Sequence, residues 1–150
     1  MAQAERRADV VWEGNLLKGH GQITTVTSGA FDELPVSWPS RTEKPGGQTS
    51  PEELLAAAHA SCYAMAFSNA LTQGGNPPER LEVSANVGLD PKAGGGVEVI
   101  FSNLTVRGRV PGMDQAAFDA AAREGEQGCP ISNALGNNVT IGLDATLETD

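Results

Sequence analysis

The sequence predicts an α+β fold, and two observations support this prediction. Segments typical of strands come first along the chain, followed by one long helix, two more strands, two helices and a last strand. Strands and helices therefore do not alternate regularly, as they do in a doubly wound parallel sheet. The length of 150 residues suits one hydrophobic core, and we expect a single domain over residues 1–150.

The most regular element is the helix predicted over residues 50–71. Ser50 is a good N-cap, Pro51 suits the first helical position, and Glu53 completes a capping box. The following positions are rich in alanine and almost uncharged for about five turns, and a helix without a strongly polar face is normally buried. A Gly-Gly-Asn-Pro-Pro run then ends the helix near Gln73.

The other elements follow from local patterns. Strands are expected where apolar and polar residues alternate or β-branched residues cluster, and helices where a capping residue precedes the segment and a glycine follows it. In chain order, the predicted elements are an N-terminal hairpin or meander within 6–26, a short strand at 36–38, a loop at 39–49, strands at 81–89 and 97–110 with a bulge near Ser102 and Asn103, a helix at 115–127 capped by Asp114, a short helix at 129–135 and a last strand at 139–147.

The charge of the chain restricts its partners. The formal net charge is −9, whereas contact with nucleic acid or anionic membranes needs clustered Lys and Arg. No apolar run reaches the length of a membrane span without polar interruption, and residues 1–7 lack the apolar core of a secretory signal. We therefore expect a cytoplasmic protein that binds neither nucleic acid nor membranes.

The two cysteines, Cys62 and Cys129, are candidates for chemistry. They form no Cys-x-x-Cys pair, which argues against structural zinc, and cytoplasmic cysteines are rarely structural disulfides. The alternative is two inert buried residues. Cys129 precedes Pro130 at a predicted helix N-terminus, where the pKa of a thiol falls, although a small buried turn residue fits equally well. Cys62 lies midway along the long helix, where burial alone raises the thiol pKa.

A reactive Cys62 needs a positive charge, and Arg41 in the preceding loop is the candidate. Alternatively, Arg41 is an ordinary solvated side chain of that loop. Glu52 lies ten residues before Cys62, roughly 15 Å along a helix axis, so the two cannot touch within one straight helix. If both serve one site, then Arg41 bridges part of the gap or Glu52 comes from a second chain. Otherwise Glu52 only complements the helix dipole.

His59 lies three residues before Cys62, so both side chains share one face of the predicted helix. A Cys–His pair could be a hydrolytic nucleophile with its base. A lone histidine on an alanine-rich helix more often packs or hydrogen-bonds to the backbone.

Two motifs together resemble a known family. The segment SPEELLAAAHASC at 50–62 and the segment GCPIS at 128–132 closely resemble the OsmC/Ohr family of thiol-dependent peroxidases. The WEG segment at 12–14 and the PGMD segment at 111–114 are similar to its OsmC branch, named after osmotically inducible protein C. The likeness runs over nearly the whole chain. It implies the OsmC-like fold, in which long central helices pack against antiparallel sheets in an intertwined homodimer.

The resemblance also implies a reaction. The family reduces organic hydroperoxides and hydrogen peroxide with two cysteines and without metal, flavin or haem. Matched by motif, Cys62 attacks the peroxide and becomes a sulfenic acid, and Cys129 converts it to a disulfide. Arg41 then stabilises the Cys62 thiolate, and Glu52 holds the guanidinium by a bidentate pair. An external dithiol reductant, of the lipoyl type or similar, would recycle the disulfide.

Two other functions stay open at the level of sequence. The chain could be a redox-sensing or ligand-binding dimer that keeps the fold without turnover. It could also be a Cys–His hydrolase that uses Cys62 and His59.

Overall fold

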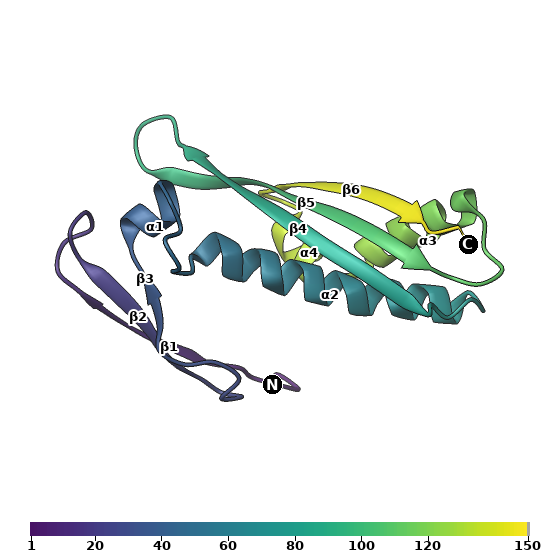
Figure 1. The fold of residues 1–150 in the computed structure, drawn as a ribbon, viewed down its shortest axis with the longest axis horizontal. Coiled ribbons are helices and arrows are strands. Elements are labelled where there is room, and N and C mark those ends of the chain that lie inside the picture. The colour runs from purple at the N-terminus through teal and green to yellow at the C-terminus, as the bar shows by residue number, and fades with distance from the viewer. Residues whose placement is uncertain (150) are drawn as a thin grey trace. The chain divides into compact units, whose positions relative to one another are not determined.

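The computed structural model describes residues 1–149, and apart from one additional short helix its helices and strands occur in the predicted order (Figure 1). The elements are β1 (Ala8–Glu13), β2 (His20–Val26), β3 (Leu34–Val36), α1 (Trp38–Thr42), α2 (Pro51–Gln73), β4 (Arg80–Pro91), β5 (Val97–Arg109), α3 (Gln115–Gln127), α4 (Pro130–Leu135) and β6 (Thr140–Leu147). The fold is mixed α+β, with two small sheets and one long helix, as expected from the sequence.

The chain divides into two compact units, Met1–Leu54 and Leu55–Asp150. The first turn of α2 belongs to the first unit and the rest of the helix to the second. That the two units make one domain stays a prediction.

The first unit contains the antiparallel sheet β1-β2-β3, which confirms the N-terminal hairpin. Trp12 of β1 is paired with Gly21 of β2. A Cβ atom at Gly21 would come within 2.7 Å of the Trp12 ring, so the indole can lie over the strand only because this position has no side chain.

Helix α1 occupies residues that the sequence assigned to a strand end and a loop. Its N-cap is Ser37, which forms a reciprocal pair with Ser40: each backbone N–H donates to the other's hydroxyl oxygen, at 3.1 and 3.2 Å. Pro39 suits the first turn of the helix. Strand β3 therefore ends at Val36, and Arg41 lies in the last turn of a helix and not in an open loop.

Helix α2 begins at the predicted cap. The backbone N–H of Glu53 donates to Ser50 Oγ at 3.1 Å, which is one half of the expected capping box. The Glu53 carboxylate instead accepts from the Thr49 hydroxyl at 3.1 Å. Ser50 is thus the predicted cap, but the Glu53 side chain bonds to the residue before the cap and not to the cap's own backbone.

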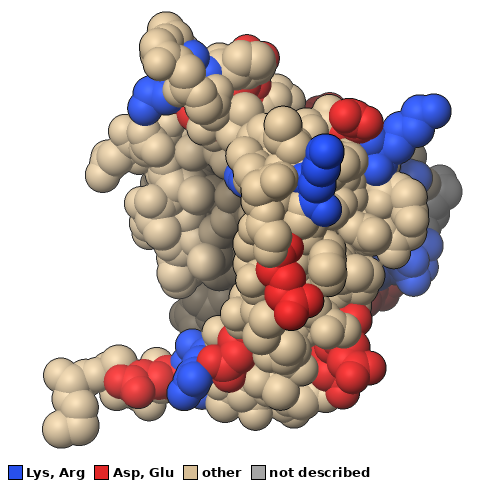
Figure 2. Space-filling model, turned by 90° about the vertical axis from the view of Figure 1, so that its left-hand side faces the viewer, with Lys and Arg blue, Asp and Glu red and all other residues tan. Residues whose placement is uncertain are grey.

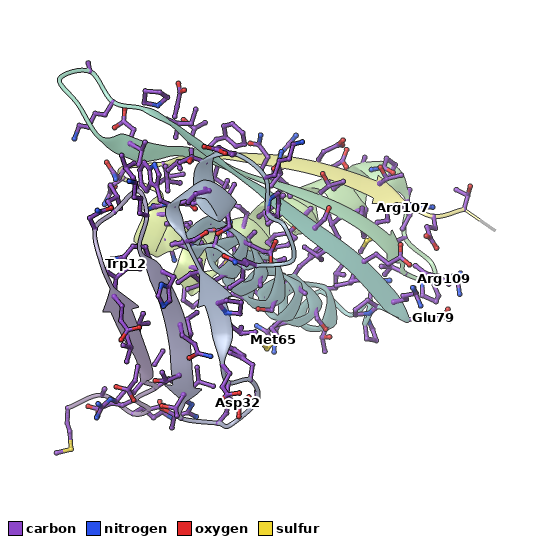
Figure 3. The ribbon with its side chains drawn as sticks, turned by 60° about the vertical axis from the view of Figure 1, so that its left-hand side comes forward. Trp12, Asp32, Met65, Glu79, Arg107 and Arg109 are labelled. Carbon is purple, nitrogen blue, oxygen red and sulfur yellow. The ribbon has the colours of Figure 1, made fainter. Side chains whose placement is uncertain are left out.

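Only one face of α2 is buried within the described chain, whereas we expected a helix buried all round. His59, Tyr63, Phe67 and Leu71 recur every four residues, and each is at most 1% exposed. The opposite side carries Met65, which is 69% exposed and labelled in Figure 3. One sheet can cover only one side of a helix, so the small residues on the other side stay accessible.

By length and composition alone, α2 passes as a membrane-spanning helix, with a mean hydropathy of 1.2 over 18 residues. Our expectation that polar interruptions exclude such a segment was therefore too strict. The buried stripe from His59 to Leu71 is nevertheless typical of the core helix of a globular unit.

The second unit contains the sheet β4-β5-β6. Strands β4 and β5 form the predicted antiparallel hairpin. Strand β6 is parallel to β5. The connection between the two strands passes through α3 and α4 and returns the chain to the end of the sheet where β5 begins. The sequence pattern did not predict this parallel pair.

The bulge in β5 lies slightly earlier than expected. The register shifts opposite Gly88 and Leu89, so that Ile100 is the unpaired residue before Phe101. From Ser102 onward, alternate side chains of β5 point inward and are almost fully buried. The bulge thus sets which face Ser102 occupies.

Charged side chains of β5 lie on its outer face. Arg107 and Arg109 project from β5, where Figure 3 labels them, and both pair with Glu148 at 3.3 and 3.5 Å. Lys and Arg side chains are scattered among acidic and uncharged ones over the face drawn in Figure 2.

The core of the second unit lies between α2, α3 and the sheet. Tyr63, Phe67 and Leu71 pack with Leu104 and Val106 of β5 and Phe118 and Ala122 of α3. The Phe67 and Phe118 rings are 5.1 Å apart, and the Tyr63 hydroxyl donates to the Ala122 carbonyl at 3.0 Å. Gly125 of α3 lies against the backbone of α2 at Phe67, and this close approach of the two helices needs a glycine at position 125.

We expect Gly125→Ala to destabilise the protein, because the new Cβ would lie 2.8 Å from Phe67 Cα. Overpacking of this kind costs about 1–3 kcal/mol in the free energy of unfolding. Urea denaturation measures the effect. Gly74→Ala is the control, since a Cβ there stays at least 3.4 Å from its neighbours. Equal losses in both variants would contradict the close packing of α2 and α3.

Candidate functional site

Arg41 and Glu52 form a partly buried ion pair within the first unit. The guanidinium donates from Nε to Glu52 Oε1 and Oε2 at 3.0 and 3.1 Å, and from Nη2 to Oε1 at 2.7 Å. The side chains are 29% and 11% exposed. The Arg41 Cζ atom also lies 5.8 Å from the Trp38 ring centre. The guanidinium is therefore held in one orientation at the end of α1.

A pocket of about 380 Å³ borders this guanidinium. It lies within the first unit, and its lining is mainly apolar. The lining residues are Trp12, Leu16, Val36, Ser37, Trp38, Arg41 and Pro51. Such a pocket suits a small molecule with an apolar body and one group that accepts hydrogen bonds from a cation.

Cys62 and Cys129 are both free thiols and lie side by side in the second unit. Cys129 is fully buried and is the N-cap of α4, as the sequence predicted, with its sulfur accepting from the Ser132 N–H at 3.5 Å. Cys62 is half-buried on α2, and the backbone N–H of Ile131 lies near enough to its sulfur to lower the pKa of the thiol. The first turn of α4 therefore contacts both sulfurs.

The pKa of Cys62 is raised above its ordinary value. Burial is the main cause and the neighbouring Cys129 adds to it, while the hydrogen bond from Ile131 acts in the opposite direction. The contacts within the second unit thus favour the protonated form of Cys62 over the thiolate. A reactive thiolate at this position needs a positive charge in addition.

His59 is fully buried between two serines. Its Nδ1 lies 2.6 Å from Ser102 Oγ on β5, and its Nε2 lies 2.7 Å from Ser132 Oγ on α4. Burial lowers its pKa, although the charge of Glu126 opposes this shift. Both ring nitrogens are engaged, so neither is available as a base for Cys62, and the hydrolase alternative loses its general base.

The serine partners of His59 were missed by the sequence analysis, which expected packing or a backbone partner. Ser102 and Ser132 lie 43 and 73 positions from His59. No local pattern links them. The one available signal was that Ser132 follows Cys129 by a single helical turn.

The structure thus brings the four expected residues together in two pairs. Arg41 and Glu52 meet in the first unit, and Cys62 and Cys129 meet in the second. Within residues 1–149, no three His, Cys, Asp or Glu side chains are placed to hold a metal ion together.

Comparisons with known proteins point to one family. The sequence model described as "OsmC-like protein" matches residues 44–144. Peroxiredoxin OsmC of Escherichia coli is 35% identical over 136 residues, which cover 91% of this chain and 93% of that protein. The organic hydroperoxide resistance protein of Xanthomonas axonopodis is 31% identical over 65% of this chain and 67% of its own.

Solved structures agree on the fold. The organic hydroperoxide resistance protein OsmC of Legionella pneumophila superposes with a TM-score of 0.72 at 23% identity, covering 97% of this chain and 99% of that one. The organic hydroperoxide resistance protein OhrB of Bacillus subtilis also gives 0.72 at 23% identity, over 93% and 98%.

We expect the buried His59 to make the protein less stable in acid. Its pKa is lowered from 6.5, so below that pH the unfolded chain binds a proton that the folded protein excludes. The free energy of unfolding then falls as the pH drops below 6.5, by at most about 1.4 kcal/mol per pH unit. Urea midpoints at about pH 7.5 and about pH 5.5 should differ more for the parent than for His59→Gln. An identical difference would mean that His59 is protonated in the folded protein.

Proposed function

Because the chain belongs to the OsmC-like family, we propose that it is a cysteine-based peroxidase that reduces organic hydroperoxides, and hydrogen peroxide as well. The observation that carries the proposal is the contact between two free thiols, Cys62 and Cys129. Relatives named for peroxiredoxin activity and organic hydroperoxide resistance support a peroxidase-type role.

In the proposed reaction, the Cys62 thiolate attacks the outer oxygen of the peroxide. The O–O bond breaks, Cys62 becomes a sulfenic acid, and the leaving alkoxide takes a proton to become an alcohol. The Cys129 thiol then attacks the Cys62 sulfur. The S–O bond breaks, a disulfide forms, and the thiol proton leaves with hydroxide as water. An external dithiol, of the lipoyl type or similar, returns both thiols, and no bound cofactor takes part.

Arg41 is proposed to supply the positive charge that Cys62 lacks. A cation within reach of a thiolate lowers the thiol pKa by about 1–3 units, in the direction opposite to that of burial. The bidentate bonds from Glu52 would keep the guanidinium aimed. Glu52 and Cys62 are ten residues apart on α2, roughly 15 Å, so Arg41 must span the gap or the pair must come from a second copy. The proposal therefore includes a homodimer, for which the exposed side of α2 is available.

The pocket beside Arg41 supports organic hydroperoxides as the preferred substrates. Its walls include two tryptophan rings, Trp12 and Trp38, which would bury an alkyl or aryl group. Hydrogen peroxide has no such group and would gain nothing from this lining. We further propose that the protein acts in the cytoplasm.

We expect Cys62→Ser to abolish peroxide reduction and Cys129→Ser to allow one turnover, followed by over-oxidation of Cys62. Without Cys129, the sulfenic acid has no resolving thiol and reacts with more peroxide. The measurement is consumption of tert-butyl hydroperoxide with dihydrolipoamide, together with mass spectrometry of the cysteines. If Cys129→Ser lost the first turnover, the two roles would be reversed. A Cys62–Cys129 disulfide without steady turnover would indicate a redox sensor.

We expect Arg41→Met to raise the pKa of Cys62 by about 1 unit or more, because the compensating charge is lost. The pH dependence of iodoacetamide alkylation, measured in the Cys129→Ser background, reports this pKa. Lys44→Met is the matched control, since it removes one positive charge from the segment between α1 and α2, at an exposed position. Equal pKa values in both variants would remove Arg41 from the mechanism.

A further inference from the structure

The hydrogen bonds of His59 extend to the turn that contacts both sulfurs. Its Nε2 atom lies 2.7 Å from the hydroxyl of Ser132, whose backbone N–H donates to Cys129 at 3.5 Å. The backbone N–H of the preceding residue, Ile131, lies near enough to the Cys62 sulfur to lower the pKa of that thiol. His59 is therefore hydrogen-bonded to Ser132, which contacts the Cys129 sulfur. Ser132 in turn follows Ile131, whose backbone lies near the Cys62 sulfur.

The other side of the imidazole is anchored in the sheet. Nδ1 lies 2.6 Å from Ser102, which is fully buried in the central strand β5. Ser102 is paired with Val87 of β4 on one side and Ile141 of β6 on the other. The Nδ1 side of the ring is thus bonded to a rigid part of the sheet, because a central strand is hydrogen-bonded along both edges.

Helix α4 has little to hold it in place by itself. It is only six residues long, and helices of that length are not stable alone. Ser132 is 2% exposed and its side chain points inward to His59. The hydrogen bond between them is therefore a direct link to the first turn of α4 from the imidazole, which is carried by α2 and only steadied by Ser102 of the sheet.

We infer that His59 is a positioning residue, which holds the first turn of α4 through Ser132 so that Cys129 faces Cys62 when the disulfide forms. This inference rests on the proposed function. Disulfide formation requires strict alignment of the two sulfurs and their Cβ atoms. If the turn is displaced, the Cys62 sulfenic acid persists, and a second peroxide oxidises it to sulfinic acid while being reduced to an alcohol.

Two substitutions of His59 separate its two hydrogen bonds. In His59→Gln, the side-chain amide can occupy the place of Nε2 and keep the bond to Ser132. In His59→Asn, the amide can occupy only the place of Nδ1 and keep the bond to Ser102. Each variant leaves one buried serine without its partner, so a general loss of stability affects both alike.

The readout is the fate of Cys62 in each turnover with tert-butyl hydroperoxide. Mass spectrometry gives the ratio of sulfinic acid to Cys62–Cys129 disulfide, and loss of the Cys62 thiol gives the rate of the first oxidation. We expect His59→Asn to raise this ratio about tenfold, which corresponds to the net contribution of one hydrogen bond. His59→Gln should stay within about twofold of the parent, and the first oxidation should keep its rate in both.

A second pair of variants keeps the test valid if a His59 variant fails to fold. Ser132→Ala removes the bond toward α4, and Ser102→Ala removes the bond toward the sheet. Ser132→Ala should raise the sulfinic acid ratio more than Ser102→Ala does. If the parent forms the disulfide but the two variants of each pair give equal sulfinic acid ratios, this inference is overturned and the proposed function is not. A parent that neither consumes peroxide nor forms the disulfide would overturn the proposed function and this inference together.

Discussion

Packing of one face of α2 against the sheet β4-β5-β6 and helix α3 is the interaction on which the second unit depends. Tyr63, Phe67 and Leu71 fill this interface and are almost fully buried. Burial of a large apolar side chain contributes about 1.5–3 kcal/mol, so these three positions outweigh any surface ion pair of the unit. The close contact at Gly125 allows α3 to approach α2 closely enough to complete the core.

The same face of α2 carries the polar residue that links this core to the thiols. His59 is the first residue of the buried stripe, one turn before Tyr63. A buried imidazole needs partners for both nitrogens, and Ser102 and Ser132 supply them from β5 and α4. The requirement for hydrogen bonds in the core thereby ties the position of α4 to the sheet.

Burial and reactivity act in opposite directions at Cys62. The core position that brings its sulfur beside Cys129 also raises its pKa. The Arg41 guanidinium is a cation that Glu52 holds in a fixed orientation by two-pronged hydrogen bonds. In the proposed function, the two units divide the work: the second contributes the sulfurs and the first contributes the cation and an apolar pocket.

Local signals in the sequence determined much of this protein. The caps of α2, α3 and α4, at Ser50, Asp114 and Cys129, could be recognised because capping involves residues three positions apart. The alternation in β4 and β5 likewise depends only on near neighbours. The cysteine motifs identified the family and hence the candidate site.

Only the tertiary structure decided the parallel pairing of β6, the bulge at Ile100 and the single buried face of α2. It also decided the environment of His59, whose partners lie 43 and 73 positions away. Helix α1 was missed because its five residues have no apolar period, and the sequence analysis did not recognise the Ser37–Ser40 capping box at its start. Contacts between distant segments depend on how strands and helices pack, which a local pattern of residues does not encode.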